Sequence, residues 1–185
     1  MASRRVAPVS VLWVNNDGFL SGFRRNLKKS AHDGDRFFHL MRRLVMQTSA
    51  RNQFAGKVVS LKTGPINAEL TVDLGGSDRI TAMITRESVA SLGLKEGVEV
   101  YALVKASSII IAPGSENLRL SARNQLRGVV VSCRKGAVNA EVSIQLQGDK
   151  LVTAVITNES IDRLGLKEGD QACAIFKASS VIIGV

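Results

Sequence analysis

The sequence predicts a mainly β protein: two tandem five-stranded barrels with one short helix each, preceded by an N-terminal amphipathic helix. Three observations predict this: an internal repeat, strand-like runs inside each copy, and a different composition in the first 48 residues. Residues 49–113 align with residues 121–185 at a constant offset of 72, without a gap and with about half of the positions identical. Two copies indicate a tandem pair of small domains.

Within each copy, runs of β-branched and apolar residues alternate with turn-forming stretches, which is typical of short strands. The stretch ITRESVASLGL is expected to form a short helix. Thr85 or Ser88 would cap its start, Val89 and Leu92 would face inward, and Gly93 would end it. Five strands with a helix between the third and fourth indicate a small OB-like barrel. The strands expected in the first copy cover residues 54–61, 67–74, 79–85, 98–104 and 107–112.

The first 48 residues carry a different pattern. Residues 35–47 are expected to form an amphipathic helix capped by Asp33 or Asp35, with Phe37, Met41, Leu44 and Val45 on one face. Residues 1–30 show no clear period, and His32 and His39 are interpreted as surface or packing residues, not metal ligands. The expected domains are residues 1–48, 49–118 and 119–185.

The positive charge is concentrated in the N-terminal segment. Residues 1–48 hold 9 Lys and Arg against 3 Asp and Glu, a net of +6, whereas residues 49–120 hold 8 against 7 and residues 121–185 hold 8 against 6. Aromatic residues after position 48 are limited to Phe54, Tyr101 and Phe176. Because single-stranded nucleic acids are bound by basic grooves with stacking aromatics, the repeats are poor candidates for a general nucleic-acid module.

The motifs of several large classes are absent from the sequence. It contains no Walker A, GxGxxG, HExxH or GxSxG pattern, and the repeats contain no histidine, so a binding protein is expected and not an enzyme. Its longest apolar stretch is far short of a membrane span. Arg4 and Arg5 followed by VAPVSVLWV resemble an export signal, but no cleavage pattern follows them. Cys133 and Cys173 are expected to be reduced. We therefore expect a cytoplasmic protein.

The polar residues that recur in both copies suit an oxyanion. Arg and Lys supply charge, hydroxyls supply adaptable donors, and backbone N–H groups at helix starts supply fixed donors. Each element also has a purely structural interpretation: SARNQ as a cap, ITRES as a helix start and KASS as the exposed end of a strand. On chemistry alone the two interpretations are evenly balanced. The recurring set comprises Ser49, Arg51, Thr85, Ser88, Lys105, Ala106 and Ser107, with Ser121, Arg123, Thr157, Ser160, Lys177, Ala178 and Ser179.

The motifs SARNQxxG, GxxNAEV, ITxES, LGLKEG and KASSVIIG resemble the Mop, or TOBE-type, molybdate- and tungstate-binding domains of the molbindins and of molybdate-responsive transcriptional regulators. The resemblance covers residues 49–185. It implies an OB-like fold, strand exchange between subunits, and cytoplasmic binding of molybdate or tungstate at subunit interfaces. It also implies that Ser49, Arg51, Lys105, Ala106 and their equivalents hold the anion, with the backbone of the alanines donating. The hydroxyls of ITxES are expected to face this group across a domain or subunit boundary.

Two functional hypotheses follow. The first is a molybdate-binding protein for storage, homeostasis or sensing, acting as a homo-oligomer (a dimer or trimer of paired domains) without another cofactor or a membrane. The second is a molybdate-responsive transcriptional regulator, because DGDRFFHLMRRLVMQTSARNQ resembles the segment before a regulator's Mop pair. A winged helix-turn-helix domain needs more than the 48 residues that precede the repeat, so a DNA-binding domain is expected to be lacking or truncated.

Overall fold

The computed structural model describes residues 47–114 and 119–185, which form one compact unit. The helix expected over residues 35–47 lies outside the described residues except for Gln47, and so do both histidines and the basic leader. The domain boundaries therefore stay predictions. No helix of the described part is both long enough and apolar enough to cross a membrane.

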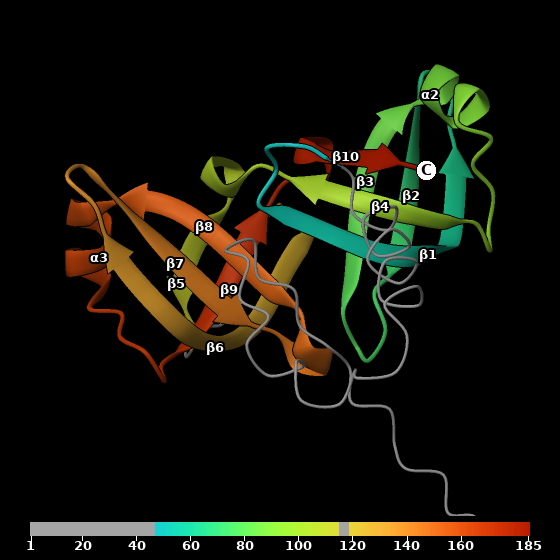
Figure 1. Ribbon diagram of the computed structural model, residues 1–185. Coiled ribbons are helices and arrows are strands. Elements are labelled where there is room, and N and C mark those ends of the chain that lie inside the picture. Colours follow the sequence, from blue (N-terminus) through green and yellow to red (C-terminus); the bar gives the residue numbers. More distant parts are fainter. Residues whose placement is uncertain (1–46, 115–118) are drawn as a thin grey trace, which may run out of the picture. The chain divides into compact units, whose positions relative to one another are not determined.

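The two repeats carry the same strands and helices in the same order, except that the second has an additional 3-10 helix between its second and third strands (Figure 1). The first repeat comprises β1 (Asn52–Thr63), β2 (Asn67–Asp73), β3 (Arg79–Thr85), α2 (Arg86–Ser91), β4 (Glu99–Val104), the 3-10 helix η1 (Ala106–Ser108) and β5 (Ile110–Pro113). The second comprises β6 (Asn124–Lys135), β7 (Asn139–Gln145), η2 (Gln147–Asp149), β8 (Leu151–Thr157), α3 (Asn158–Leu164), β9 (Gln171–Phe176), η3 (Ala178–Ser180) and β10 (Val181–Gly184).

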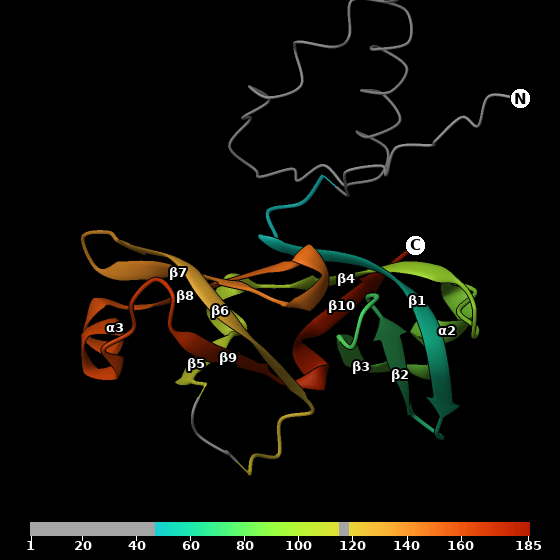
Figure 2. The same cartoon turned by 90° about the horizontal axis from the view of Figure 1, so that it is seen from below.

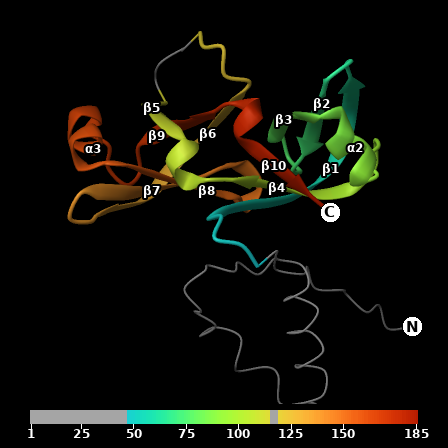
Figure 3. The same ribbon diagram turned by 90° about the horizontal axis from the view of Figure 1, so that it is seen from above.

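The strands form two five-stranded antiparallel sheets that exchange their last strands. One sheet has the order β10-β4-β1-β2-β3 and the other β5-β9-β6-β7-β8. In Figure 2 the red strand β10 accordingly lies beside the green β4 of the first repeat, and in Figure 3 β5 lies beside β9 of the second. Val181 is opposite Val104, and Ile110 is opposite Ile175. Each barrel is therefore completed by the other repeat.

This exchange corrects two expectations. Each repeat was expected to supply all five strands of its own barrel, and strand exchange was expected between subunits; here the exchange joins the two repeats of one chain. The fifth strand is also shorter than residues 107–112, because a 3-10 turn at Ala106–Ser108 redirects the chain before β5 begins. The mainly β fold and its two five-stranded sheets are confirmed.

The long first strand of each repeat bends because of a bulge and a close backbone approach. The register shifts between Val58 and Ser60 in β1 and between Val130 and Ser132 in β6. Shortly before each bulge a glycine lies against the neighbouring strand. A Cβ atom at Gly128 would stand 2.1 Å from the carbonyl oxygen of Gln145. Only glycine fits such an approach.

The short helices begin and end as the sequence indicates. The Thr85 hydroxyl accepts a hydrogen bond of 3.0 Å from the Ser88 N–H at the start of α2, and Gly93 follows the helix with a φ of 61°. Thr85 is thus the cap, as its β-region backbone requires, and Ser88 lies in the first turn. In the second repeat Thr157 caps α3 in the same way.

The apolar core runs through both repeats. Alternate residues of the central strands are buried, as the pattern of β2 shows. Leu70 in the first repeat and Ile144 in the second are fully buried and belong to one hydrophobic cluster. Cys133 is half-buried and Cys173 is buried, and both are free thiols. The two repeats therefore share one apolar core.

Candidate oxyanion site

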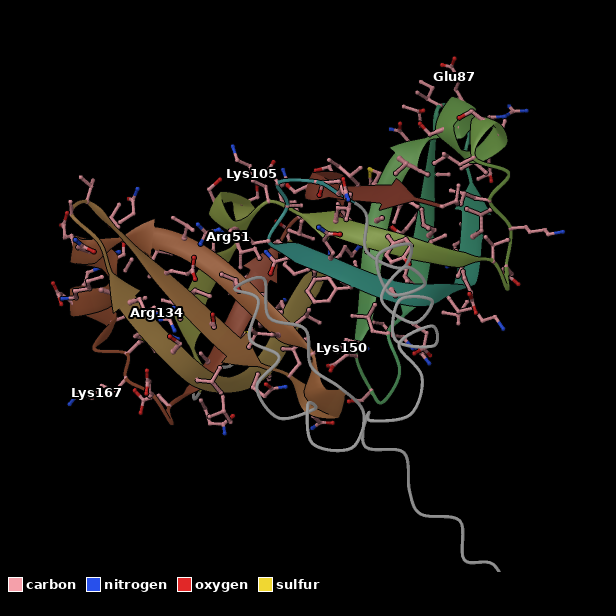
Figure 4. The ribbon with its side chains drawn as sticks, in the orientation of Figure 1. Arg51, Glu87, Lys105, Arg134, Lys150 and Lys167 are labelled. Carbon is pink, nitrogen blue, oxygen red and sulfur yellow. The ribbon has the colours of Figure 1, made fainter. Side chains whose placement is uncertain are left out.

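The SARN and KASS motifs of each repeat lie side by side. Asn52 is opposite Val104 in the β1–β4 ladder, so the next residues outward, Arg51 and Lys105, lie at the same end of the sheet. Figure 4 shows these two labelled side chains near one another. In the second repeat Asn124 is opposite Phe176, which brings Arg123 to Lys177.

We call these groups the first and second clusters. The first cluster consists of Ser49, Arg51, Lys105, Ala106 and Ser107; the second consists of Ser121, Arg123, Lys177, Ala178 and Ser179. Their charged side chains are exposed, whereas the two alanines are buried at the start of η1 and η3. Each cluster therefore combines two exposed cationic groups with a backbone turn whose alanine is buried.

A glutamine shapes the turn that carries each arginine. The Gln53 side-chain amide donates to the Ala50 carbonyl at 3.1 Å and to the Thr48 hydroxyl at 3.3 Å. Gln125 donates to the Ala122 carbonyl at 3.3 Å in the second repeat. The Gln of SARNQ thus folds the preceding residues back on the strand, which explains its presence in both copies.

The arginine of each cluster is paired with a glutamate of the other repeat. Arg51 Nη1 contacts Oε2 of Glu141 in β7, and Arg123 Nη1 lies 2.9 Å from Oε2 of Glu69 in β2. The glutamate side chains are the less exposed partners, at 34% and 26%. Each cluster thus holds two cations and one carboxylate. Neither glutamate is among the site residues expected from the sequence, although both stand in the NAE motif of the two copies.

An asparagine links each cluster to the opposite repeat. Asn52 is 1% exposed; its Nδ2 donates to the carbonyls of Thr153 at 2.8 Å and Val104 at 3.1 Å, and its Oδ1 accepts from the Thr153 N–H at 2.7 Å. Asn124 bonds to both backbone atoms of Thr81 at 2.8 Å. The Asn of SARN, which sequence analysis left without a role, therefore holds the SARN strand of one repeat against the third strand of the other.

The ITxES hydroxyls lie elsewhere. Oγ1 of Thr157 and Oγ of Ser160 are 2.8 Å apart at the start of α3, and Thr85 and Ser88 make the same contact at α2. Thr157 lies four residues beyond Thr153, about 13 Å along an extended strand, and Glu87 on α2 is far from Arg51 and Lys105 in Figure 4. Within the described part of one chain, no hydrogen bond joins these hydroxyls to either cluster.

The clusters favour anions over metal cations. Among residues 47–114 and 119–185, no group of three or more His, Cys, Asp or Glu side chains could hold a metal ion. Guanidinium and ammonium groups are donors without acceptors, and they make strong charge-assisted hydrogen bonds to oxyanions. The arrangement can therefore bind an anion that is rich in oxygen.

Two small barrels that complete each other, with equivalent cationic clusters where they join, define a tandem small-barrel binding module. The chain belongs to the TOBE domain family, whose sequence profile matches residues 48–111 and 120–183. The Molybdenum transport protein ModE of Azotobacter vinelandii is 46% identical over 149 residues, which are 80% of this chain and 55% of that protein.

Two further similarities bear on function. A crystal structure of the cytoplasmic molybdate-binding protein ModG with molybdate bound matches with a TM-score of 0.73 and 49% identity over 76% of this chain and 99% of that one. The DNA-binding transcriptional dual regulator ModE of Escherichia coli (strain K12) is 37% identical over 143 residues, 76% of this chain and 53% of that protein. This chain thus spans about half the length of the curated relatives it matches.

Proposed function

We propose that this protein binds molybdate, and tungstate as well, at sites built on the two clusters, for intracellular molybdenum storage, homeostasis or sensing. One observation supports the proposal: in both repeats the SARN arginine and the KASS lysine follow paired strands at the same end of the sheet, in a chain that is 49% identical to a molybdate-bound structure. Binding a preformed oxyanion requires no catalytic group, so the proposed role is not enzymatic.

The chemistry of the clusters suits a tetrahedral dianion. Arg51 and Lys105 would supply charge, Ser49 and Ser107 would supply hydroxyl donors, and the buried Ala106 would offer its backbone N–H, with the equivalent residues acting in the second cluster. Molybdate, tungstate and sulfate carry similar charge, so the dimensions of the site would have to discriminate among them. Molybdate or tungstate is the only bound group that this proposal requires.

We assign the ITxES hydroxyls to a neighbouring subunit. Thr85 and Ser88, like Thr157 and Ser160, are exposed or half-buried, and among residues 47–114 and 119–185 their hydroxyl groups bond only within each Thr–Ser pair. Large apolar residues are exposed at equivalent positions of both repeats, which supports association of copies of the chain. These residues are Val59 with Val131, Ile66 with Val138, and Ile110 with Ile182. A dimer or trimer would bring the hydroxyls of one copy to a cluster of the next.

Calorimetric titration of the full chain tests the function. We expect saturable binding of molybdate and tungstate, with sulfate binding at least tenfold more weakly. Absence of molybdate binding, or equal affinity for sulfate, would refute the proposal. Native mass spectrometry of the same samples, with and without molybdate, reports the oligomeric state and the number of anions bound; a monomer at saturation would refute the assignment of the ITxES hydroxyls to a neighbour.

The second candidate is a molybdate-responsive transcriptional regulator, which the similarity to the Escherichia coli regulator favours. In that case DNA affinity should depend on molybdate and fall steeply with salt, because each neutralised phosphate releases counterions. Gel shifts on DNA at two salt concentrations, with and without molybdate, check this. DNA affinity that does not change with molybdate, or absence of DNA binding at low salt, would exclude the candidate.

A further inference from the structure

The two arginine–glutamate pairs are related by the repeat. Glu69 and Glu141 occupy equivalent positions, and so do Arg51 and Arg123. In each pair the arginine of one repeat contacts the glutamate of the other repeat. Both pairs join one repeat to the other, so they are a feature of the junction.

The backbone holds each carboxylate in place. Glu141 is opposite Val155 in the β7–β8 ladder, two residues from Thr153, to which Asn52 is bonded. Arg51 directly precedes Asn52, and it therefore lies over the strand that carries Glu141. In the other half, Glu69 is opposite Met83, two residues from Thr81, to which Asn124 is bonded.

The contact leaves most of the guanidinium donors available. In the described part of the chain the carboxylate contacts involve Nη1 of each arginine, whereas a guanidinium carries five N–H donors in a planar fork. Nε–H and Nη2–H can still donate to a bound oxyanion. Because a half-exposed arginine loses rotamer freedom when it is ordered, a carboxylate that orders it beforehand strengthens anion binding by preorganisation.

We propose that Glu141 and Glu69 are positioning residues for the anion sites: each orients the arginine of the opposite repeat so that its remaining N–H groups face the ligand. The inference rests on the proposed function and extends it. Each anion site then draws on both repeats, because the cations belong to one repeat and the group that orders the arginine belongs to the other. Occupancy of either cluster therefore depends on the pairing of the repeats.

The test is a set of molybdate titrations on the full chain. Glu141→Gln keeps the shape of the side chain but removes the charge that holds Arg51. We expect the affinity of the first cluster for molybdate to fall about tenfold, because ordering an arginine side chain costs a rotamer entropy equivalent to about that factor. Glu69→Gln should do the same at the second cluster. Asp73→Asn is the matched control, since it removes the carboxylate of another arginine–carboxylate pair, Arg79–Asp73, at the end of β2 remote from Glu69.

A double-mutant cycle separates positioning from a general structural role. In an Arg51→Ala background, Glu141→Gln should change affinity less than twofold, because no guanidinium remains to be oriented. The same tenfold loss of affinity in that background would overturn the proposal. Unchanged or tighter molybdate binding by the single variant Glu141→Gln would also overturn it, and tighter binding would mean that the carboxylate competes with the ligand.

The wild-type and Arg51→Ala titrations distinguish a failure of molybdate binding from a failure of the positioning role. A wild-type protein that takes up no molybdate overturns the proposed function together with this inference. If the wild-type protein binds but Arg51→Ala leaves the affinity unchanged, the arginine site and the positioning role fail, while molybdate binding stands. If Arg51→Ala weakens binding and Glu141→Gln does not, only the positioning role fails.

Discussion

Asn52 of the first repeat bonds to the backbone N–H and C=O of Thr153 in the second, as another strand would. Asn124 and Thr81 form the equivalent pair in the opposite direction. A buried side-chain amide here extends the hydrogen bonding of one barrel into the other. The junction of the repeats is therefore held by specific polar contacts as well as by exchanged strands.

Replacing Asn52 by alanine should destabilise the fold by about 2–3 kcal/mol, because it removes three hydrogen bonds and leaves buried backbone groups of Thr153 unpaired. Asn124→Ala should have a similar effect. Chemical denaturation measures the loss, and Asn67→Ala, at an exposed strand start, is the control. Equal stabilities of Asn52→Ala and this control would contradict the role given to the amide.

Arg51→Ala or Lys105→Ala should weaken molybdate binding at the first cluster by about 1.5–3 kcal/mol, the value of one charge-assisted contact. Arg123→Ala and Lys177→Ala should act on the second cluster. Isothermal titration calorimetry resolves these losses, and Lys95→Ala, an exposed cation outside both clusters, serves as the control. If the control lost as much affinity as Lys105→Ala, net charge and not the cluster would explain the effect.

Gly128→Ala should destabilise the second barrel by about 1–3 kcal/mol, because the new methyl group would collide with the Gln145 carbonyl and force the strands apart. Gly56→Ala should affect the first barrel in the same way, with the Asp73 carbonyl 2.5 Å from the added atom. Ala55→Ser, at the exposed neighbouring position, should stay within about 0.5 kcal/mol of wild type. Urea unfolding of the three variants compares them directly.

Asp78 gives a prediction on pH. Burial raises the pKa of this carboxyl, and the nearby Lys150 offsets only part of the effect. Oδ2 of Asp78 is buried without a hydrogen-bond partner. A folded-state pKa above the unfolded one means that the folded state binds the proton more tightly, so this group's contribution to stability falls as pH rises through the folded pKa.

We therefore expect Asp78→Asn to raise the free energy of unfolding by about 0.5–1 kcal/mol at pH 7, since the unpaired buried charge is gone. The gain should shrink as the pH is lowered through the pKa of Asp78, where the wild-type carboxyl becomes neutral as well. Thermal unfolding of both proteins between pH 3 and pH 7, in steps of about half a unit, measures the difference. A constant difference would show that Asp78 keeps its ordinary pKa.

The local elements could be predicted from the sequence because local physics determines them. The strand expected over residues 79–85 matches Arg79–Thr85, and Thr85 caps the helix that follows, since alternating burial and cap chemistry are visible in a single stretch of chain. Recurrence in both copies groups the SARN and KASS residues in the sequence, and the structure adds that the two motifs lie at adjacent ends of paired strands.

The contacts between the repeats could not be predicted in the same way. Residues 110–113 have the same pattern whether they pair with their own barrel or with the other one, because both repeats offer nearly identical partners. The pairing of Arg51 with Glu141 likewise depends on how the barrels meet, which hydrophobic periodicity does not encode. The expected contacts of Thr157 and Ser160 with a cluster stay a prediction for the assembled protein.

The placement of β10 has a consequence for biosynthesis. β4 ends at Val104 and its outer partner begins at Val181, 77 positions later, so the first barrel has an open edge until residues 181–184 have been made. At about 5–20 residues per second, the ribosome needs roughly 4–15 seconds to supply them. A chain truncated before Val181 would thus lose the closing strand of the domain that was synthesised first.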